Sequence, residues 1–463
     1  MKGYYLMPHP PLMVHEIGKG EEAKIQKTID SCNAIGEEIS QLNVDTIIII
    51  TPHGTIFRDA IAMIGEETLE GNLGKFGASK ISFKLKIDTL LTNEIIKEAE
   101  KVNIPTVKLN KQNENVYRVK LKLDHGAAIP LYHIKDIDKY KIVHITYGML
   151  APIELYYFGM AIEQACKNTN TQAVLIASGD LSHRLTEDGA YPYSPYGKKF
   201  DLQLIDILRQ GRISDLFNMD QTLINEAAEC GLRSIYILAG ALDGKEAKAD
   251  ILSYEGPFGV GYGVAKFNFK DGKSIYTDLK EIGKLKHLRR LKEGNAYTKL
   301  ARRNLENYLK NGRPLSINDI KDAKLLNNRK GVFVSLKIKG ELRGCIGTIE
   351  AVTPSIAEEI MHNSISAAFN DPRFPPLRED ELFEIDISVD LLYPAQKCSF
   401  NELDPKNYGV IVTSGRKRGL LLPNLEGVNT KEEQISIALQ KAGINPNEPY
   451  EIERFKVERF IEE

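Results

Sequence analysis

The sequence predicts an N-terminal α/β domain, with a mixed, largely parallel sheet flanked by helices, followed by a smaller α+β domain. Three observations lead to this prediction. The chain has 463 residues, which is too long for a single hydrophobic core. Up to about residue 268, short β-branched runs alternate with longer amphipathic segments. A polar, basic stretch then interrupts the pattern, and helices and strands restart in a different order.

The first part of the chain contains the alternating elements. Strands are expected at Gly3–Met7, Thr46–Thr51, Ile81–Ile87, Lys141–Thr146, Ala173–Ser178 and Ile251–Tyr254. Helices are expected at Gly20–Gln41, Thr89–Val102, Pro152–Lys167, Pro195–Arg209, Asp220–Cys230 and Arg233–Asp243. A glycine-rich segment, Gly256–Val264, leads into a last strand that ends near Phe267. Alternation of this kind favours a largely parallel sheet with helices on its faces.

The second part follows an expected linker at residues 269–293, so the domain boundaries are predicted at 1–268 and 294–463. Leucines interleave the basic run Lys284–Lys292, which is typical of a solvated amphipathic face rather than a nucleic-acid contact. Helices are expected at Ala296–Lys310, around Pro354–Asn370 and at Thr430–Ala442. Strands are expected at Gly331–Ile338, from Leu342, and at Ile385–Tyr393, Gly409–Ser414 and Tyr450–Phe460, with a hairpin turn at Lys339-Gly340. Helices set apart from antiparallel strands indicate an α+β domain.

The composition excludes several classes of protein. Hydrophobic residues make up 42% and charged residues 27%, with a formal net charge of −2, so no global field attracts nucleic acid or an acidic membrane. Five widely spaced cysteines fit a reducing compartment better than a disulfide framework. The N-terminus does not resemble a signal peptide, and runs such as Thr46–Ile50 are far too short to span a bilayer. The expected location is the cytoplasm, with neither nucleic acid nor membrane as a partner.

Three histidines, His9, His53 and His183, each lie where an apolar run gives way to a loop. Ligands of open α/β sheets bind at that edge, and imidazoles gathered there suit metal binding or proton transfer. His9 and His53 are the expected pair of metal ligands, because neighbouring Pro and Gly residues stiffen their loops. The third ligand should be a carboxylate or a thiolate, and Glu229 and Cys230 are the candidates.

Two acidic–histidine pairs are candidates for acid–base chemistry. Asp180 and His183 are spaced by one helical turn, and Asp124 directly precedes His125. A carboxylate beside an imidazole fixes its tautomer and raises its basicity. The alternative for each histidine is a hydrogen-bonded structural role, and the alternative for Cys230 is a buried apolar thiol. The structural role is preferred for His15, His133, His144, His287 and His362.

Cys345 is the notable residue of the second part. Gly344 and Gly347 flank it and Arg343 lies two residues away, so the thiol sits on a tightly turning backbone near a cation. Such surroundings lower a thiol pKa and make it reactive. The alternative is a β-hairpin whose glycines permit a bulge and whose cysteine packs inward.

Five motifs of the first part occur together and in order: His-Pro near the N-terminus, a strand ending in Pro-His, Asp-His-Gly with a following Pro-Leu, Ser-Gly-Asp-x-Ser-His, and Glu-x-x-Glu-Cys-Gly-x-Arg. Up to about residue 268 this pattern resembles the class III extradiol dioxygenases of the LigB type and their Memo relatives. The resemblance implies a LigB/Memo-like fold and non-haem Fe(II). It implies His9, His53 and Glu229 as ligands and His125 and His183 as acid–base residues.

The resemblance also implies rival third ligands. Memo-type proteins place a ligating cysteine at the position of Cys230, and Asp180 is the other acidic candidate. A thiolate ligand favours copper or zinc over iron and weakens the prediction of ring cleavage.

The second part resembles the AMMECR-type domain over about residues 294–463. The similarity lies in Arg343–Gly347, in the proline-locked segment Phe369–Leu377 and in Gly419–Pro423. A Memo-like domain fused to this one resembles the A and B parts of the AmmeMemoRadiSam system, which implies a radical-SAM protein as a partner. The chain lacks the Cys-x3-Cys-x2-Cys motif of such an enzyme, so that component is separate.

We therefore expect a mononuclear non-haem Fe(II) oxidoreductase that resembles extradiol ring-cleaving dioxygenases and acts on a catechol-like or other aromatic substrate. The expected partners are a small aromatic molecule, O2 and a separate radical-SAM protein, and a homodimer is left open. The alternative is a protein that holds iron or copper for redox work or delivery, with the AMMECR-type domain docking its partner. The identity of the third ligand separates the two functions.

Overall fold

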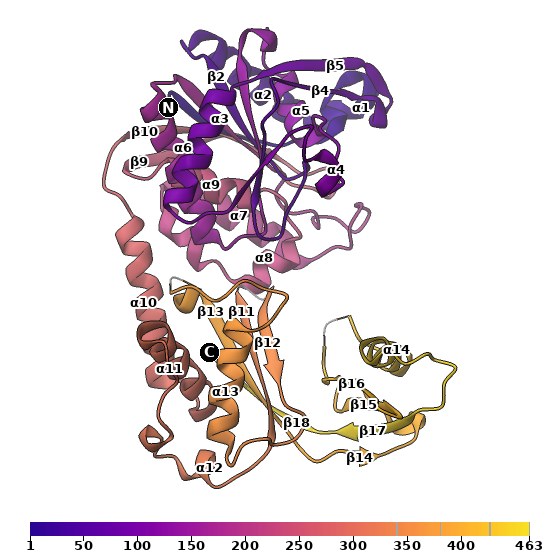
Figure 1. The fold of residues 1–463 in the computed structure, drawn as a ribbon. Helices are drawn as coiled ribbons and strands as arrows, with labels where there is room; N and C mark the ends of the chain where they lie inside the picture. Colours follow the sequence, from indigo (N-terminus) through magenta and orange to yellow (C-terminus); the bar gives the residue numbers. More distant parts are fainter. Residues whose placement is uncertain (339–340, 380, 426, 463) are drawn as a thin grey trace. The chain divides into compact units, whose positions relative to one another are not determined.

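The computed structural model describes residues 1–338, 341–379, 381–425 and 427–462, which fall into two units, Met1–Leu279 and Lys280–Glu463 (Figure 1). The expected fold class is confirmed: a mixed sheet flanked by helices in the first unit, and antiparallel sheets with helices in the second. The expected turn at Lys339-Gly340 lies outside the described residues.

The first unit is built on one sheet with the strand order β4-β5-β7-β2-β8-β1-β10-β9, and β3 and β6 attach beside β7. The strands are β1 (Gly3–Met7), β2 (Thr46–Thr51), β3 (Ile61–Ile64), β4 (Thr68–Leu73), β5 (Ala78–Ile87), β6 (Thr106–Leu109), β7 (Lys141–Thr146), β8 (Ala173–Ser178), β9 (Lys245–Glu255) and β10 (Tyr262–Asp271). The central strands β7, β2, β8 and β1 pair in parallel. The edges β4/β5 and β10/β9 pair antiparallel.

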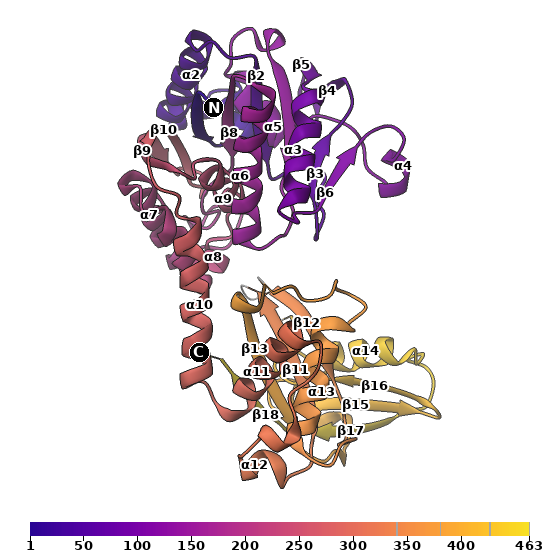
Figure 2. The ribbon, with the colours of Figure 1, turned by 60° about the vertical axis from the view of Figure 1, so that its left-hand side comes forward.

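Helices cover both faces of this sheet (Figures 1 and 2). They are α2 (Gln26–Gln41), α3 (Thr89–Lys101), α5 (His125–Tyr132), α6 (Pro152–Thr169), α7 (Pro195–Gln210), α8 (Gln221–Ala227) and α9 (Leu232–Ala241). Helices α2 and α5 share a core with Tyr5 and Met7 of β1. Tyr4 points to the other face, where its hydroxyl bonds Glu163 of α6 and the Ala241 carbonyl of α9. Because β2 and β8 are covered on both faces, every residue in them is buried.

The second unit has two antiparallel sheets, in the orders β12-β11-β13-β18 and β14-β17-β15-β16. Their strands are β11 (Gly331–Ile338), β12 (Glu341–Gly347), β13 (Ile385–Leu392), β14 (Gln396–Lys397), β15 (Gly409–Ser414), β16 (Lys417–Leu421), β17 (Glu451–Phe455) and β18 (Val457–Ile461). The helices are α11 (Ala296–Asn311), α12 (Ala323–Leu326), α13 (Ile356–Phe369), α14 (Lys431–Ala442) and most of α10 (Tyr276–Glu293), whose first residues belong to the first unit. The first sheet packs on α11 and α13, and the second packs on α14.

Two expected segments after residue 268 take a different form. The segment expected as a linker, residues 269–293, contains the end of β10 and the whole of α10. The single strand expected at Tyr450–Phe460 is two strands, because β17 pairs in one sheet and β18 in the other. Between them the Lys456 carbonyl leaves both ladders and accepts the amide of Tyr393. Among the residues that the structure describes, no helix combines the length and apolar character needed to cross a membrane.

A fully buried ion pair holds the second unit together. Arg302 of α11 is 0% exposed, and its Nε and Nη2 each lie 2.6 Å from an oxygen of Glu462. The same guanidinium donates to the carbonyls of Leu382 and Ile385, and Glu462 accepts the amide of Ile387 in β13. Because nearly every polar atom is matched, the pair tolerates complete burial, whereas either partner alone would not.

We predict that Glu462→Ala destabilises the second unit by about 3–5 kcal/mol, because it leaves the Arg302 charge buried without a partner. Hydrogen exchange resolved by mass spectrometry measures this loss as faster exchange in β13. The control is Glu451→Ala, which removes the exposed pair between Lys397 and Glu451 and should leave β13 unchanged. Equal effects of the two substitutions would contradict the prediction.

Candidate metal centre

The candidate centre lies at the carboxyl ends of three neighbouring parallel strands. Strand β8 pairs in parallel with β1 on one side and with β2 on the other. His9 follows β1, His53 follows β2, and Asp180 and His183 follow β8. The topology therefore brings segments from distant parts of the chain to one edge of the sheet, as expected for α/β sheets.

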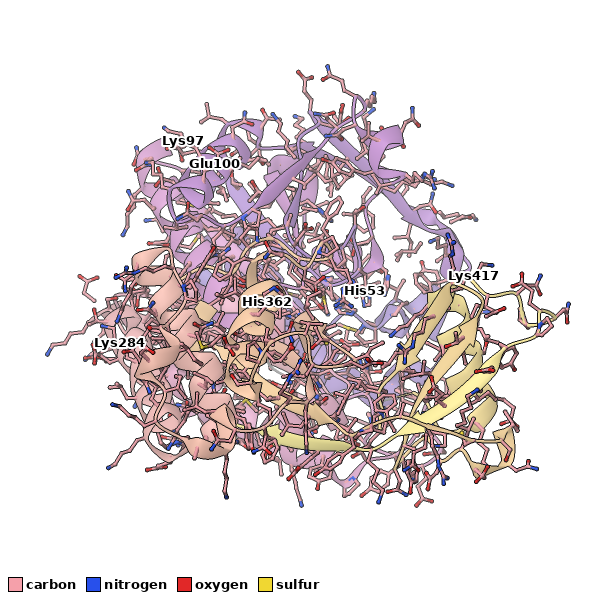
Figure 3. The ribbon with its side chains drawn as sticks, turned by 60° about the horizontal axis from the view of Figure 1, so that its bottom comes forward. His53, Lys97, Glu100, Lys284, His362 and Lys417 are labelled. Carbon is pink, nitrogen blue, oxygen red and sulfur yellow. The ribbon has the colours of Figure 1, made fainter. Side chains whose placement is uncertain are left out.

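Three imidazoles converge at this edge: His9, His53 (labelled in Figure 3) and His125. One ligand nitrogen of each lies within 4.8 Å of the others. The Nε2 atoms of His9 and His53 are 2.9 Å apart, and their rings are perpendicular. The ring of His125, at the start of α5, stacks on His53 with centroids 4.3 Å apart. His9 is buried, His125 is partly buried and His53 is exposed, so the cluster opens to solvent on one side.

The hydrogen bonds of His9 fix its tautomer. The hydroxyl of Ser178, the last residue of β8, donates to the Gly126 carbonyl at 2.5 Å. A hydroxyl has one proton, so Ser178 Oγ accepts from His9 Nδ1–H, 2.9 Å away. His9 Nε2 therefore presents a lone pair toward His53. Burial, followed by the neighbouring His53, lowers the pKa of His9 to about 3, so the imidazole is neutral at pH 7, as a metal ligand must be.

The turn between α8 and α9 holds the candidates for the third ligand. The helix expected at residues 220–230 ends earlier, at Ala227, because Ala228 adopts a left-handed conformation with φ 51°. Glu229 and Cys230 then face different ways. The Glu229 carboxylate accepts the Leu232 amide at 2.5 Å at the start of α9, whereas Cys230 Sγ lies 3.7 Å from His9 Nε2.

The loop after β8 supplies the acid–base candidates Asp180 and His183. The expected helical turn is wrong: the segment is an irregular loop, and its Leu181 amide bonds the Gly261 carbonyl. Asp180 Oδ1 accepts the backbone amide of His9 at 2.9 Å, and Oδ2 lies 4.0 Å from His9 Nε2. The ring of His183 stacks on Tyr191 with centroids 5.1 Å apart. Asp180 thus belongs to the His9 side of the centre, and His183 adjoins an aromatic ring.

This donor set fits a metal ion. The Nε2 atoms of His9 and His53, 2.9 Å apart, are close enough to bind one ion together. Burial raises the pKa of Asp180 to about 6 and that of Cys230 well above its usual range. A bound cation would reverse both shifts, since it favours the anionic forms of its neighbours. His9 and His53 are the two imidazoles best placed to hold it, and Cys230, Asp180 and His125 surround them.

The sequence did not predict a role in the centre for several residues. Ser178 and Thr51 are polar residues that end apolar strands, and His144 is a polar residue inside the apolar strand β7. These breaks in apolar runs are the signals that could have marked them. Phe76, at the end of a short 3-10 helix, has its ring 5.3 Å from that of His125, and Tyr191 lies in a loop. Neither segment has a distinctive sequence pattern.

Cys345 lies on β12, in the antiparallel pair that β12 forms with β11. Its thiol accepts the Ser335 hydroxyl at 3.2 Å, and its backbone bonds Asp371 and Arg373. Burial raises the pKa of the thiol, against the effects of Ser335 and Arg373. A reactive thiol at this position stays a prediction.

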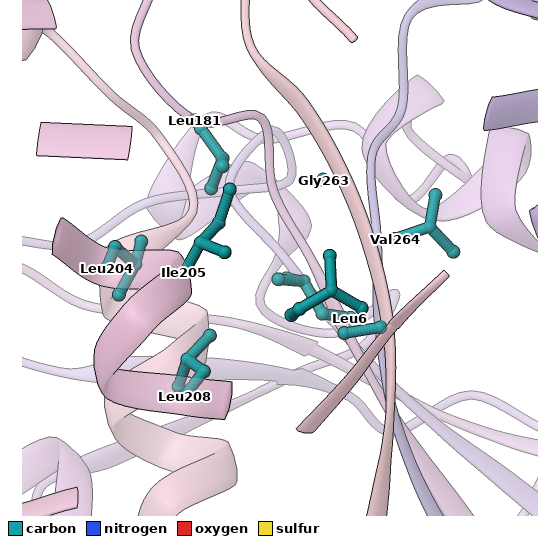
Figure 4. A pocket seen from close by; sticks show the side chains of 9 residues that line it. Leu6, Leu181, Leu204, Ile205, Leu208, Gly263 and Val264 are labelled. Carbon is teal, nitrogen blue, oxygen red and sulfur yellow. The ribbon is translucent and has the colours of Figure 1, made fainter. Parts of the chain in front are cut away.

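A small cavity between α7 and the sheet is separate from the centre. It has a volume of about 10 Å³, roughly that of one water molecule. Its wall consists of Leu6, Leu181, Leu204, Ile205, Leu208, Ile251, Gly263, Val264 and Ala265 (Figure 4). A site so small and apolar does not suit a polar substrate.

Comparisons with known proteins match both units. Residues 3–265 match the family described as the catalytic LigB subunit of aromatic ring-opening dioxygenase, and residues 298–460 match AMMECR1. Protein CA_C1420 of Clostridium acetobutylicum is 49% identical over 465 residues, covering 100% of this chain and 99% of that protein. A protein of Thermotoga maritima is 49% identical over 167 residues, covering 35% of this chain and 96% of that protein.

Two crystal structures of uncharacterized proteins are also similar. PH0010 from Pyrococcus horikoshii is 31% identical and covers 37% of this chain and 91% of its own, with a TM-score of 0.34. JW3007 from Escherichia coli K12 is 13% identical and covers 57% of this chain and 99% of its own, with a TM-score of 0.41.

We predict that Cys230→Ser changes the metal centre more than Glu229→Gln does, because the sulfur, and not the Glu229 carboxylate, adjoins His9. Co(II) is a suitable probe, since a cobalt–thiolate bond gives a charge-transfer band in the near ultraviolet. The band should disappear in Cys230→Ser and persist in Glu229→Gln. Loss of bound Co(II) in Glu229→Gln alone would favour the carboxylate as ligand instead.

Proposed function

We propose that this chain, which belongs to the family of the catalytic LigB subunit of aromatic ring-opening dioxygenase, is a mononuclear non-haem iron oxidoreductase that acts on a catechol-like aromatic molecule. The chain continues with an AMMECR1 domain. The observation that supports the proposal most is the pair of nitrogens of His9 and His53, 2.9 Å apart beside His125, with the lone pair of His9 turned inward. Two imidazoles with an adjacent acidic group are the usual donors for non-haem iron.

In this proposal a bound Fe(II) ion supplies the point at which a catechol-like ring and O2 meet. The protein side chains hold and move protons around it. His125 has a pKa lowered to about 4 by burial and by His53, so at neutral pH it is a free base able to accept a phenolic proton. His183, whose pKa burial also lowers, offers a second neutral imidazole on the side of Tyr191.

Aromatic side chains next to the acid–base residues support an aromatic substrate. The ring of Phe76 meets that of His125 edge-on, and the ring of Tyr191 stacks on His183. Both aromatic residues are well exposed, at 38% and 47%. Exposed rings at a site offer stacking partners to a planar ligand, which is worth about 0.5–1.5 kcal/mol per pair beyond the area buried.

A specific observation favours a second function. Cys230 Sγ lies 3.7 Å from His9 Nε2, and a thiolate ligand suits copper or zinc better than ring-cleaving iron. Under this alternative the centre holds iron or copper for redox work or delivery. The AMMECR1 domain then docks a separate radical-SAM protein.

The test of ring cleavage is anaerobic loading with Fe(II), followed by air and a panel of catechols. We expect loss of catechol absorbance and a yellow ring-opened product. His183→Ala should lower the rate ~10²–10⁴-fold, because it removes a general acid–base group. The matched control is His133→Asn, which alters another buried histidine of the first unit whose partner is Asn33.

Stoichiometric metal binding without turnover of any catechol would favour the carrier function. In that case, both the wild-type chain and Cys230→Ser are loaded with metal and mixed with a competing chelator. The variant should lose its metal faster, because one ligand is missing. Unchanged metal affinity in both His9→Ala and His53→Ala would contradict both functions.

A further inference from the structure

One carboxylate links two of the three imidazoles of the centre. Asp124 caps the N-terminus of α5, where its Oδ1 accepts the Ala127 amide at 3.1 Å. The same oxygen accepts the hydroxyl of Thr51 at 2.6 Å, and Thr51 Oγ accepts the backbone amide of His53 at 3.2 Å. Since α5 begins at His125, Asp124 ties the backbone of His53 to that of His125.

Close packing makes this link rigid. An added Cβ at Gly126 would lie 2.5 Å from Thr51 Oγ1 and 3.2 Å from the His53 ring. An added Cβ at Gly54 would lie 2.0 Å from the hydroxyl of Thr146, at the end of β7. The first turn of α5 and the loop after β2 therefore have no room to shift without losing these contacts.

The second oxygen of Asp124 is held by a histidine outside the cluster. His144 lies on β7, its side chain is 3% exposed, and its Nε2 is 2.8 Å from Asp124 Oδ2. Within the described part of the chain, its Nδ1 has no hydrogen-bond partner. Asp124 Oδ2 is a hydrogen-bond acceptor, so His144 donates to it through Nε2–H. The carboxylate then receives donors from His144, Thr51 and Ala127.

We propose that His144 is a positioning residue of the metal centre. It acts through Asp124 to hold the imidazoles of His125 and His53 in their positions relative to that of His9. This inference rests on the proposed function only in that the centre binds a metal ion. Within the described part of the chain, His144 forms no hydrogen bond or ring contact with His9, His53 or His125, and its effect on them passes through Asp124. Comparable outer partners of metal ligands contribute ~10–100-fold to metal affinity.

The test compares two substitutions of His144, by glutamine and by asparagine, whose side-chain amides differ in reach by one methylene group. In His144→Gln the amide nitrogen reaches the position of Nε2 and can still donate to Asp124, whereas in His144→Asn it falls short. We expect the Kd of the full chain for Co(II), titrated by absorbance, to rise ~10–100-fold in His144→Asn and to stay within a few-fold of wild type in His144→Gln. The visible spectrum of bound Co(II) should change in His144→Asn alone.

Thermal unfolding of each variant separates positioning from stability. The control His133→Asn also removes a buried imidazole with one side-chain partner, Asn33, and should lower Tm without changing the Kd. Equal Kd values in His144→Asn, His144→Gln and wild type would overturn the positioning role while leaving the metal centre intact. Failure of the wild-type chain to bind Co(II) would overturn the proposed function, and this inference with it.

Discussion

The centre depends on the first turn of α5, because that turn is bonded to the ends of both flanking strands. The Gly126 carbonyl accepts Ser178, which in turn orients the ring of His9. Asp124, two residues earlier, reaches the backbone of His53 through Thr51. The parallel strands bring the imidazoles to one edge, and the turn decides how the rings face one another. A buried polar network with its donors and acceptors matched is rigid, and rigidity is what a set of metal ligands needs.

The electrostatics of the centre follow from this arrangement. The imidazoles of His9 and His125 are kept neutral by burial, so their nitrogens can bind rather than repel a cation. Burial also favours the protonated forms of Asp180 and Cys230. The neutral imidazoles therefore offer lone pairs to a cation, and a bound cation would favour the anionic forms of Asp180 and Cys230 on the side of His9.

Sequence patterns could predict which edge of the sheet holds the centre. They could not predict which way the side chains at that edge point. His9, His53 and His183 end apolar runs, and parallel strands bring such ends together, so their neighbourhood follows from topology. The choice between Glu229 and Cys230 depends on Ala228, whose left-handed conformation ends α8 early, and alanine carries no signal for that. Short strands such as β3 and β6 are missed because four residues are too few to show a two-residue period. The change of sheet between β17 and β18 is missed because the alternation of side chains continues through it.

The buried ion pair of Arg302 and Glu462 affects the order in which the two units fold during translation. The first unit ends at Leu279, so it can fold while the ribosome is still translating the second unit. The second unit cannot complete its core in the same way, since Glu462, whose carboxylate neutralises Arg302, follows all the helices and strands of that unit. Until then α11 holds an unmatched charge that resists burial. The two halves of the chain should therefore mature in sequence, with the AMMECR1 domain closing only after translation has passed Glu462.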